Sequence, residues 1–150
     1  MTRFNSFRVL IALTIFTTYA LWNLVAWAIS QPVEMGDTYR YFGFQILDAQ
    51  NPGITTSLLY QSVQDPQILT FIQVVLATCA FLLLAGVVLI QTQWRVAGLI
   101  ASALVLLIFM TAFMTAPLRS WQTLLATEGV TMSFSIIWLA TIIIPFNRER

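Results

Sequence analysis

The sequence has no histidine, no lysine and only one cysteine, Cys79. Histidine usually supplies the axial ligands of haem b in helical bundles, and zinc, copper and non-haem iron sites depend heavily on imidazole. A single cysteine cannot form an intramolecular disulfide, and its position inside an apolar run predicts a small buried side chain. These absences argue against a self-contained haem or transition-metal site, so we expect no cofactor.

Charged residues are also scarce. They make up 9% of the chain, and hydrophobic residues make up 59%, whereas ordinary globular domains contain about 25% charged residues. The seven basic residues are all arginines, and six acidic residues leave a formal charge of +1. This balance offers no basic field for nucleic acid, and the composition is that of a membrane protein.

The stretch from Pro66 to Pro117 is almost uncharged. It contains two long apolar segments joined by a short polar turn, and Arg95 in that turn is its only charge. A helix needs about 20 apolar residues to cross the roughly 30 Å of hydrocarbon in a bilayer. We therefore predict a transmembrane hairpin with spans at about 67–90 and 96–116.

Two further apolar segments flank this hairpin in the sequence. The first, at about 9–29, is longer than the roughly 7–15 apolar residues of a signal peptide and lacks a good cleavage site, so we expect a retained span. Trp22 and Trp27 lie toward its far end, as tryptophans that anchor a helix at the membrane interface would. The last segment, at about 129–144, ends at Pro145.

Together, the four segments predict an all-α membrane protein with four transmembrane helices in a single domain over residues 1–150. The second span has a compact start signal, because Asp65 is suited to the N-cap position and Pro66 to the first helical position. None of the predicted spans carries an ionisable residue well inside it, which argues against an autonomous ion-coupled transporter.

Residues 31–65 form the one long polar connection and hold four of the six acidic residues. We expect an extracytoplasmic loop with short amphipathic helices at the membrane surface. Its most polar and aromatic part contains Asp37, Tyr39, Arg40 and Tyr41. Carboxylates beside tyrosines suit cation binding or acid–base catalysis. A solvated loop, with Asp37 as a helix cap and the aromatic side chains as interface anchors, explains the same residues.

The distribution of arginines predicts the orientation. With four spans, both termini lie on one side of the membrane, and that side carries five of the seven arginines: Arg3, Arg8, Arg95, Arg148 and Arg150. The other side carries Arg40 and Arg119 together with most of the acids. The positive-inside rule therefore places both termini in the cytoplasm, and we expect the protein in a bacterial inner membrane.

Three polar or small residues are candidates for contacts between helices. Gly98 and Ser102 have a small-xxx-small spacing, which lets two helix backbones approach closely. Asn23 is polar enough to bond a neighbouring helix, or to lie near the lipid headgroups.

Arg119, Trp121 and Gln122 precede the last span in a short connection. An arginine and a tryptophan at this depth could hold a lipid phosphate or a quinone head group, and they equally suit a loop that is simply anchored at the interface. The sequence Arg119-Ser120-Trp121-Gln122, the chain length, the four spans and the long first external loop resemble a bacterial family of predicted small integral membrane proteins of unknown function. That resemblance implies a fold but no known activity.

The function that we expect is that of a non-catalytic accessory subunit in a larger membrane complex, such as an energy-transducing one, with lipids and other membrane subunits as partners. A lipid- or quinone-binding protein that uses Arg119, Trp121 and Gln122 is the first alternative. A membrane enzyme that uses the carboxylates of the 31–65 loop is the second.

Overall fold

The computed structural model describes residues 6–30, 62–63, 65–114 and 127–144 of the chain, and its elements are all α-helices. They are α1 (Ser6–Ala28), α4 (Pro66–Gln91), α5 (Val96–Met114) and α7 (Thr127–Ile143). Each helix lies where the sequence predicts an apolar segment, so the all-α prediction is confirmed for this part of the chain. The short helices expected in the 31–65 loop fall on residues 31–61 and 64, which lie outside the described residues.

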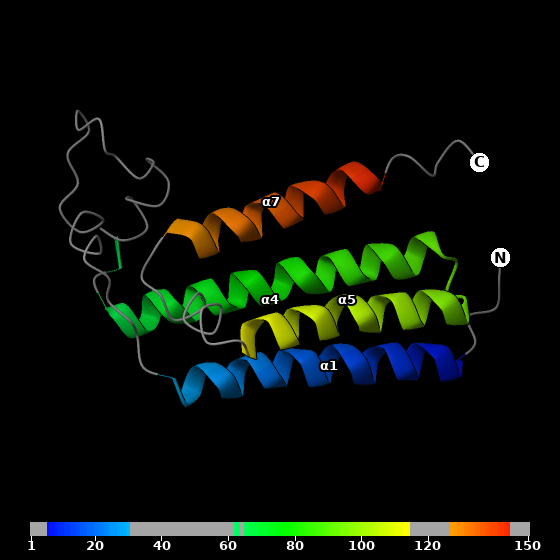
Figure 1. Cartoon of the computed structure of the whole chain (residues 1–150), viewed down its shortest axis with the longest axis horizontal. Helices are drawn as coiled ribbons and strands as arrows, with labels where there is room; N and C mark the ends of the chain where they lie inside the picture. Colours follow the sequence, from blue (N-terminus) through cyan, green and yellow to red (C-terminus); the bar gives the residue numbers. More distant parts are fainter. Residues whose placement is uncertain (1–5, 31–61, 64, 115–126, 145–150) are drawn as a thin grey trace.

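Two of the helices, α1 and α4, are long and apolar enough to cross a membrane by length and composition. The other two contain shorter apolar helices, at Val96–Thr111 in α5 and Val130–Ile143 in α7. The four helices run roughly parallel to one another with alternating direction, as the colours of Figure 1 show. Consequently, α4 and α7 end where α1 and α5 begin.

The start of α4 confirms the predicted signal. Asp65 is the N-cap, and its carboxylate accepts a hydrogen bond from the backbone N–H of Gln67 at 2.8 Å and a longer one from Ile68. Pro66 occupies the first helical turn, where a missing N–H leaves no hydrogen bond unmade. A side-chain acceptor thus satisfies amide groups that the helix itself leaves without partners.

A tight turn reverses the chain between α4 and α5. Gln93 and Trp94 have φ angles of 53° and 58°, in the left-handed region that non-glycine residues seldom adopt. The Trp94 N–H donates to the Leu89 carbonyl at 3.1 Å, and the Leu99 N–H donates to the Arg95 carbonyl as the next helix begins. This turn brings α5 back along α4 as an antiparallel neighbour (Figure 1).

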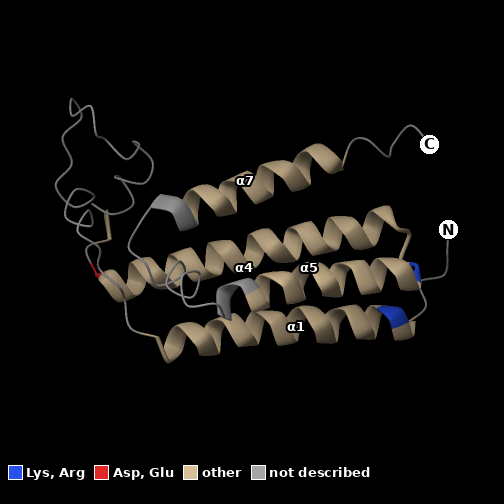
Figure 2. Cartoon of the chain, in the orientation of Figure 1, with Lys and Arg blue, Asp and Glu red and all other residues tan. Residues whose placement is uncertain are grey.

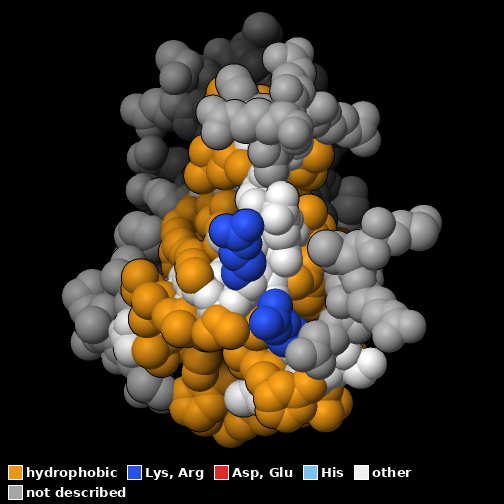
Figure 3. Space-filling model, turned by 90° about the vertical axis from the view of Figure 1, so that its right-hand side faces the viewer, with side chains coloured by type: hydrophobic (Ala, Val, Ile, Leu, Met, Phe, Trp, Pro, Cys, Tyr) orange, Lys and Arg blue, Asp and Glu red, His pale blue; other side chains and the backbone are white. Residues whose placement is uncertain are grey.

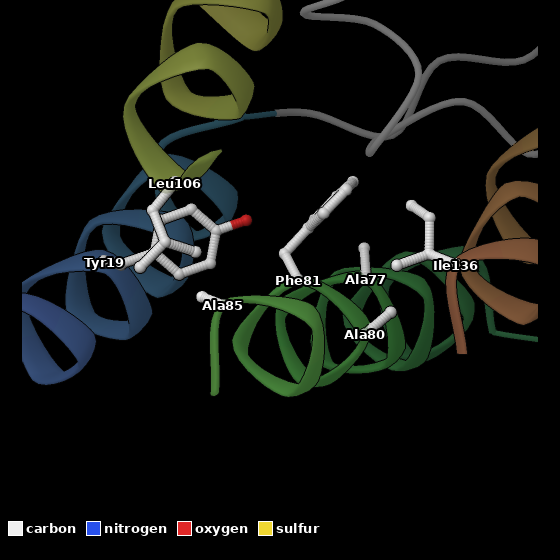
Figure 4. Packing of buried hydrophobic residues seen from close by; sticks show 7 residues of the cluster. All are labelled: Tyr19, Ala77, Ala80, Phe81, Ala85, Leu106 and Ile136. Atoms are coloured by element: carbon white, nitrogen blue, oxygen red, sulfur yellow. The ribbon is translucent and has the colours of Figure 1, made fainter. Parts of the chain in front are cut away.

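The central helix is α4, which packs against α1, α5 and α7, while α1 also contacts α5. The main core cluster draws on all four helices (Figure 4) and comprises Tyr19, Ala77, Ala80, Phe81, Ala85, Leu106 and Ile136. The rings of Phe81 and Phe109 lie 3.6 Å apart between centroids, which joins α4 to α5. The small alanines of α4 let the neighbouring helices approach, and the large rings fill the space that remains.

The outer surface of the helices is unlike that of a water-soluble bundle, because many large apolar side chains are exposed on it. On α1, Leu10 and Leu13 are 61% and 58% exposed, whereas the polar Asn23 is only 2% exposed. The other helices also have exposed apolar side chains, and the buried polar residues in the described part of the chain are Asn23, Thr70, Gln73, Thr78, Ser102 and Ser133. Large apolar side chains face outward while several hydroxyl and amide groups lie between the helices.

One prediction from the sequence is wrong. Cys79, expected to be a small buried residue, is exposed on the outer face of α4. Its neighbours Thr78 and Ala80 are both buried. Since successive helical positions are rotated by about 100°, Cys79 turns away from the other helices while these two face them. An apolar run gives no sign of which of its residues face outward when its outer face is also apolar.

Candidate functional site

The two groups of site residues predicted in the loops lie outside the described residues. They are Asp37, Tyr39, Arg40 and Tyr41 in the first loop, and Arg119, Trp121 and Gln122 before α7. The cation-binding, lipid-binding and quinone-binding hypotheses that depend on them stay predictions. The structure does place the three predicted packing residues, and it also brings together side chains that the sequence did not connect.

Ser102 of α5 lies between helices and is 2% exposed. Its hydroxyl donates a hydrogen bond to the Ala85 carbonyl of α4 at 2.8 Å. A hydroxyl that bonds a carbonyl on the next helix adds a polar tie to an otherwise apolar contact. Ala85 is fully buried, and its small side chain lets the two backbones come near enough for this bond.

Gly98, also on α5, faces the end of α4 rather than its middle. A Cβ at this position would overlap the Thr92 side chain, with the Thr92 Cβ at 2.7 Å and the hydroxyl oxygen nearer still. Thr92 is the C-cap of α4, and its hydroxyl lies within hydrogen-bond distance of the Val88 and Leu89 carbonyls. The glycine therefore makes room for the residue that closes the preceding helix.

Asn23 is buried near the end of α1. Its side-chain amide donates to the Tyr19 carbonyl, one turn earlier in the same helix, at 3.0 Å. Buried hydroxyl groups lie on the other helices as well, and among the described residues the Thr78 hydroxyl of α4 makes no hydrogen bond.

Two arginines lie together at one end of the bundle (Figure 2). Arg8 is in the first turn of α1, and Arg95 immediately precedes α5. We call the end formed by Arg8, Gln91, Trp94 and Arg95 the arginine end. Asp65, at the start of α4, lies at the opposite end, so opposite charges are separated along the length of the bundle.

The Arg8 guanidinium joins α1 to the turn between α4 and α5. Its Nη1 atom donates to the Trp94 carbonyl at 3.1 Å in a partly buried position. Trp94 itself packs beside a second apolar cluster formed by Ala12, Leu89 and Leu99. A charged donor thus satisfies a carbonyl in a turn whose left-handed backbone leaves it outside regular helical bonding.

At the same end, a second side chain bonds a backbone carbonyl in the last turn of α7. The Gln91 amide donates to the Ile143 carbonyl at 3.0 Å, so the last residue of α4 bonds the last residue of α7. Carbonyls in the last turn of a helix have no partner within that helix, and a neighbouring amide replaces the water that would otherwise bond them. Arg8 and Gln91 thereby link α1 and α7 to the α4–α5 hairpin.

At the opposite end of the bundle, an aromatic side chain joins α1 to α4. The indole N–H of Trp27 donates to the Thr70 hydroxyl at 3.2 Å, and Thr70 in turn donates to the Gln67 carbonyl. The Trp27 ring packs on Phe71 with centroids 4.9 Å apart. We call this group, Trp27, Thr70 and Phe71 with the N-cap Asp65, the tryptophan end.

Sequence reasoning recognised the residue types at both ends but not their partners. The sequence predicts Trp27 as an interface anchor and Arg8 as a cytoplasmic charge, and it does not predict that either side chain bonds another helix. The only available signal was the position of Arg8 and Arg95 near span ends that a four-helix topology brings to the same side. Gln91 gave no signal, because one glutamine at a helix end is compatible with many environments.

Within the described residues, no three of the side chains that commonly bind metals lie together. The chain matches no protein-family model, and no curated protein or solved structure matches it.

Proposed function

We propose that the protein is an integral membrane protein with four spans and that it serves as a non-catalytic accessory subunit of a larger membrane complex. The observation that carries the membrane part is the surface of the bundle, where large apolar side chains are exposed on all four helices. Water would penalise such a surface at about 25 cal/mol per Å² of exposed apolar area, whereas lipid would not.

The dimensions of the helices support four spans. At about 1.5 Å per residue, the 26 residues of α4 extend about 39 Å and the 17 residues of α7 about 26 Å. A hydrocarbon core of roughly 30 Å accommodates the longer helix with its ends in the headgroups, and the shorter one with slight local thinning. All four helices are apolar around most of their circumference, as helices in contact with lipid are.

Two contacts support a retained first span rather than a removable leader. α1 is tied to the rest of the bundle by Arg8 at one end and by Trp27 at the other. Tyr19, from the middle of α1, belongs to the main core cluster. Loss of this helix would leave the Trp94 carbonyl and the faces of α4 and α5 without these partners.

The charge distribution supports a cytoplasmic location for both termini. Arg8 and Arg95 lie at the end where α1 begins and α7 ends, and the acidic Asp65 lies at the other end. The positive-inside rule assigns the arginine end to the cytoplasm of a bacterial inner membrane. The 31–65 connection would then be extracytoplasmic.

An accessory role is supported by the filled centre of the bundle. Tyr19, Phe81 and Leu106 are almost fully buried and occupy the space among α1, α4 and α5, with Ile136 on the side of α7 (Figure 4). A centre packed in this way suits a rigid structural unit better than a conduction path. The exposed side chains Phe134, Trp138 and Leu139 on α7 offer an apolar surface that can contact either lipid or another subunit.

Extraction in a mild detergent tests the accessory role. We expect the tagged protein, expressed at its natural level, to migrate in native gels as part of an assembly larger than a small homo-oligomer, with co-purifying membrane subunits identified by mass spectrometry. Recovery as a lone monomer or small homo-oligomer in several mild detergents would contradict the accessory role. Resistance to alkaline carbonate extraction separately tests the membrane location.

A further inference from the structure

The arginine end carries positive charge that the described residues do not neutralise. Arg95 is exposed, and within the described part of the chain no acidic side chain lies at this end. Arg8 uses one N–H group for the Trp94 carbonyl. A guanidinium has five N–H donors in a planar fork, so this bond leaves most of the fork able to bind a second acceptor.

The surroundings of the two arginines are apolar. Figure 3 shows both guanidinium side chains on the same end face, with hydrophobic side chains around much of the rim of that face. Among the neighbouring residues with described side chains, Val96 and Ile90 are both more than half exposed, and Phe7 is 66% exposed. Charges within such a rim, on a bundle with lipid-facing sides, lie where the hydrocarbon meets the headgroups.

Trp94 adds a third element to this face. Its ring is half-buried and contacts the apolar cluster of Ala12, Leu89 and Leu99, while its carbonyl is bonded by Arg8. Tryptophan is enriched at headgroup depth, because the ring is apolar and the N–H is polar. Trp94 directly precedes Arg95 in the chain, in the turn where Gln93 and Trp94 have left-handed backbone.

We infer that Arg8, Trp94 and Arg95 form a binding surface for the headgroup of an anionic phospholipid. A phosphate diester offers two anionic oxygens that match the fork of an arginine, and the cytoplasmic leaflet supplies phospholipids with net negative charge. The acyl chains of such a lipid would lie along the apolar outer faces of α1 and α5, where Leu10, Ile100 and Leu104 are exposed. This inference rests on the membrane location proposed above.

A lipid phosphate bound by both arginines would strengthen the attachment of α1 to the turn between α4 and α5. Arg8 belongs to α1, whereas Trp94 and Arg95 belong to the turn that joins α4 to α5, and these parts are held together at this end by the bond from Arg8 to the Trp94 carbonyl and by the apolar cluster of Ala12, Leu89 and Leu99. A phosphate that accepts hydrogen bonds from both arginines would add a further polar connection between the same two parts. Anionic lipid should therefore raise the thermal stability of the bundle.

The experiment uses the full-length protein in nanodiscs of phosphatidylcholine alone or with phosphatidylglycerol. We expect phosphatidylglycerol to raise the melting temperature and to remain bound in native mass spectra. Arg95→Gln should weaken the binding of phosphatidylglycerol about fivefold, because each basic residue near an anionic surface contributes about 1 kcal/mol. Arg8→Lys, which keeps a charge but loses the fork, should weaken binding less than Arg95→Gln does.

Gln67→Glu is the matched control, since it lowers the net charge by one as Arg95→Gln does, but at an exposed position at the start of α4, the opposite end of the bundle. It should leave the binding of phosphatidylglycerol unchanged. Equal binding of phosphatidylglycerol by the parent and the Arg95→Gln variant, or an equal loss in Gln67→Glu, would overturn the inference. Stabilisation by inorganic phosphate as large as that by phosphatidylglycerol would also overturn it, because the ligand would then be a free anion.

A failure of this inference can be told apart from a failure of the proposed location. Protein that is removed from membranes by alkaline carbonate contradicts the membrane location itself. Protein that resists carbonate and reconstitutes into nanodiscs, but shows no preference for phosphatidylglycerol, contradicts only the headgroup surface.

Discussion

The two ends of the bundle attach α1 to α4 and α5 by different chemistry. At the arginine end, a guanidinium donates to a backbone carbonyl in a left-handed turn. At the tryptophan end, a neutral indole donates to a threonine hydroxyl, and its ring packs on a phenylalanine ring at an interplanar angle of 57°. The first tie adds a positive charge to the end face, whereas the second adds none. A protein can therefore close both ends of a bundle and still keep them electrically different, which is what a fixed orientation in a membrane requires.

Among substitutions at the two ends, we expect the largest loss of stability at Gly98, beside the turn between α4 and α5. Gly98→Ala should destabilise the protein by about 3 kcal/mol, because the new Cβ overlaps Thr92 and displaces it from the Val88 and Leu89 carbonyls. The measurement is the free energy of unfolding by SDS titration in mixed micelles.

Gly86 provides the matched control on α4. A Cβ there would meet nothing within 4 Å, so Gly86→Ala should be neutral or stabilise the helix by up to about 1 kcal/mol. If both substitutions changed stability equally, the tight approach between Gly98 and Thr92 would not be what constrains the arginine end.

We expect the second largest loss of stability when the hydrogen bond from Arg8 to the Trp94 carbonyl is removed. Arg8→Met keeps most of the aliphatic stem but removes the donor, and should cost about 2 kcal/mol because a hydrogen bond from a charged group is lost and the Trp94 carbonyl loses its partner. The same SDS titration measures the loss. Arg95→Met serves as the control, since the Arg95 side chain is exposed, and its cost in micelles without phosphatidylglycerol should be near zero.

We expect the smallest loss of stability when the hydrogen bond from the Trp27 indole to the Thr70 hydroxyl is removed. Trp27→Phe removes the indole N–H but keeps an aromatic ring beside Phe71, so we expect a loss of about 1 kcal/mol, in line with a hydrogen bond between neutral groups. Thr70→Val, which removes the acceptor, should add little when combined with Trp27→Phe. A fully additive double variant would mean that these two side chains act independently.

The roles of some residues at each end can be predicted from the sequence alone, but their hydrogen-bond partners cannot. Asp65 followed by Pro66 predicts the start of α4 correctly, because capping depends on residues only two or three positions apart. Trp27 and Arg8 were recognisable as interface residues from their distance along an apolar run. Their partners Thr70 and Trp94 are 43 and 86 positions away, and no local rule connects residues at that separation.

The sequence by itself determined that this protein is built of apolar helices and where each helix lies, because helix formation and hydrophobic length depend on short-range chemistry. It also predicted that Arg8 and Arg95 lie at the same end of the bundle, as the structure shows. Only the tertiary structure decided which face of each helix lies inside. In a chain that is apolar on nearly every face, contrast between apolar and polar positions no longer marks the core. Cys79 therefore proved to be exposed, while Asn23 and Gln73 proved to be buried. The close fit of alanines, rings and a few hydroxyls against α4 selects the inward faces, and that fit exists only once the helices have been assembled.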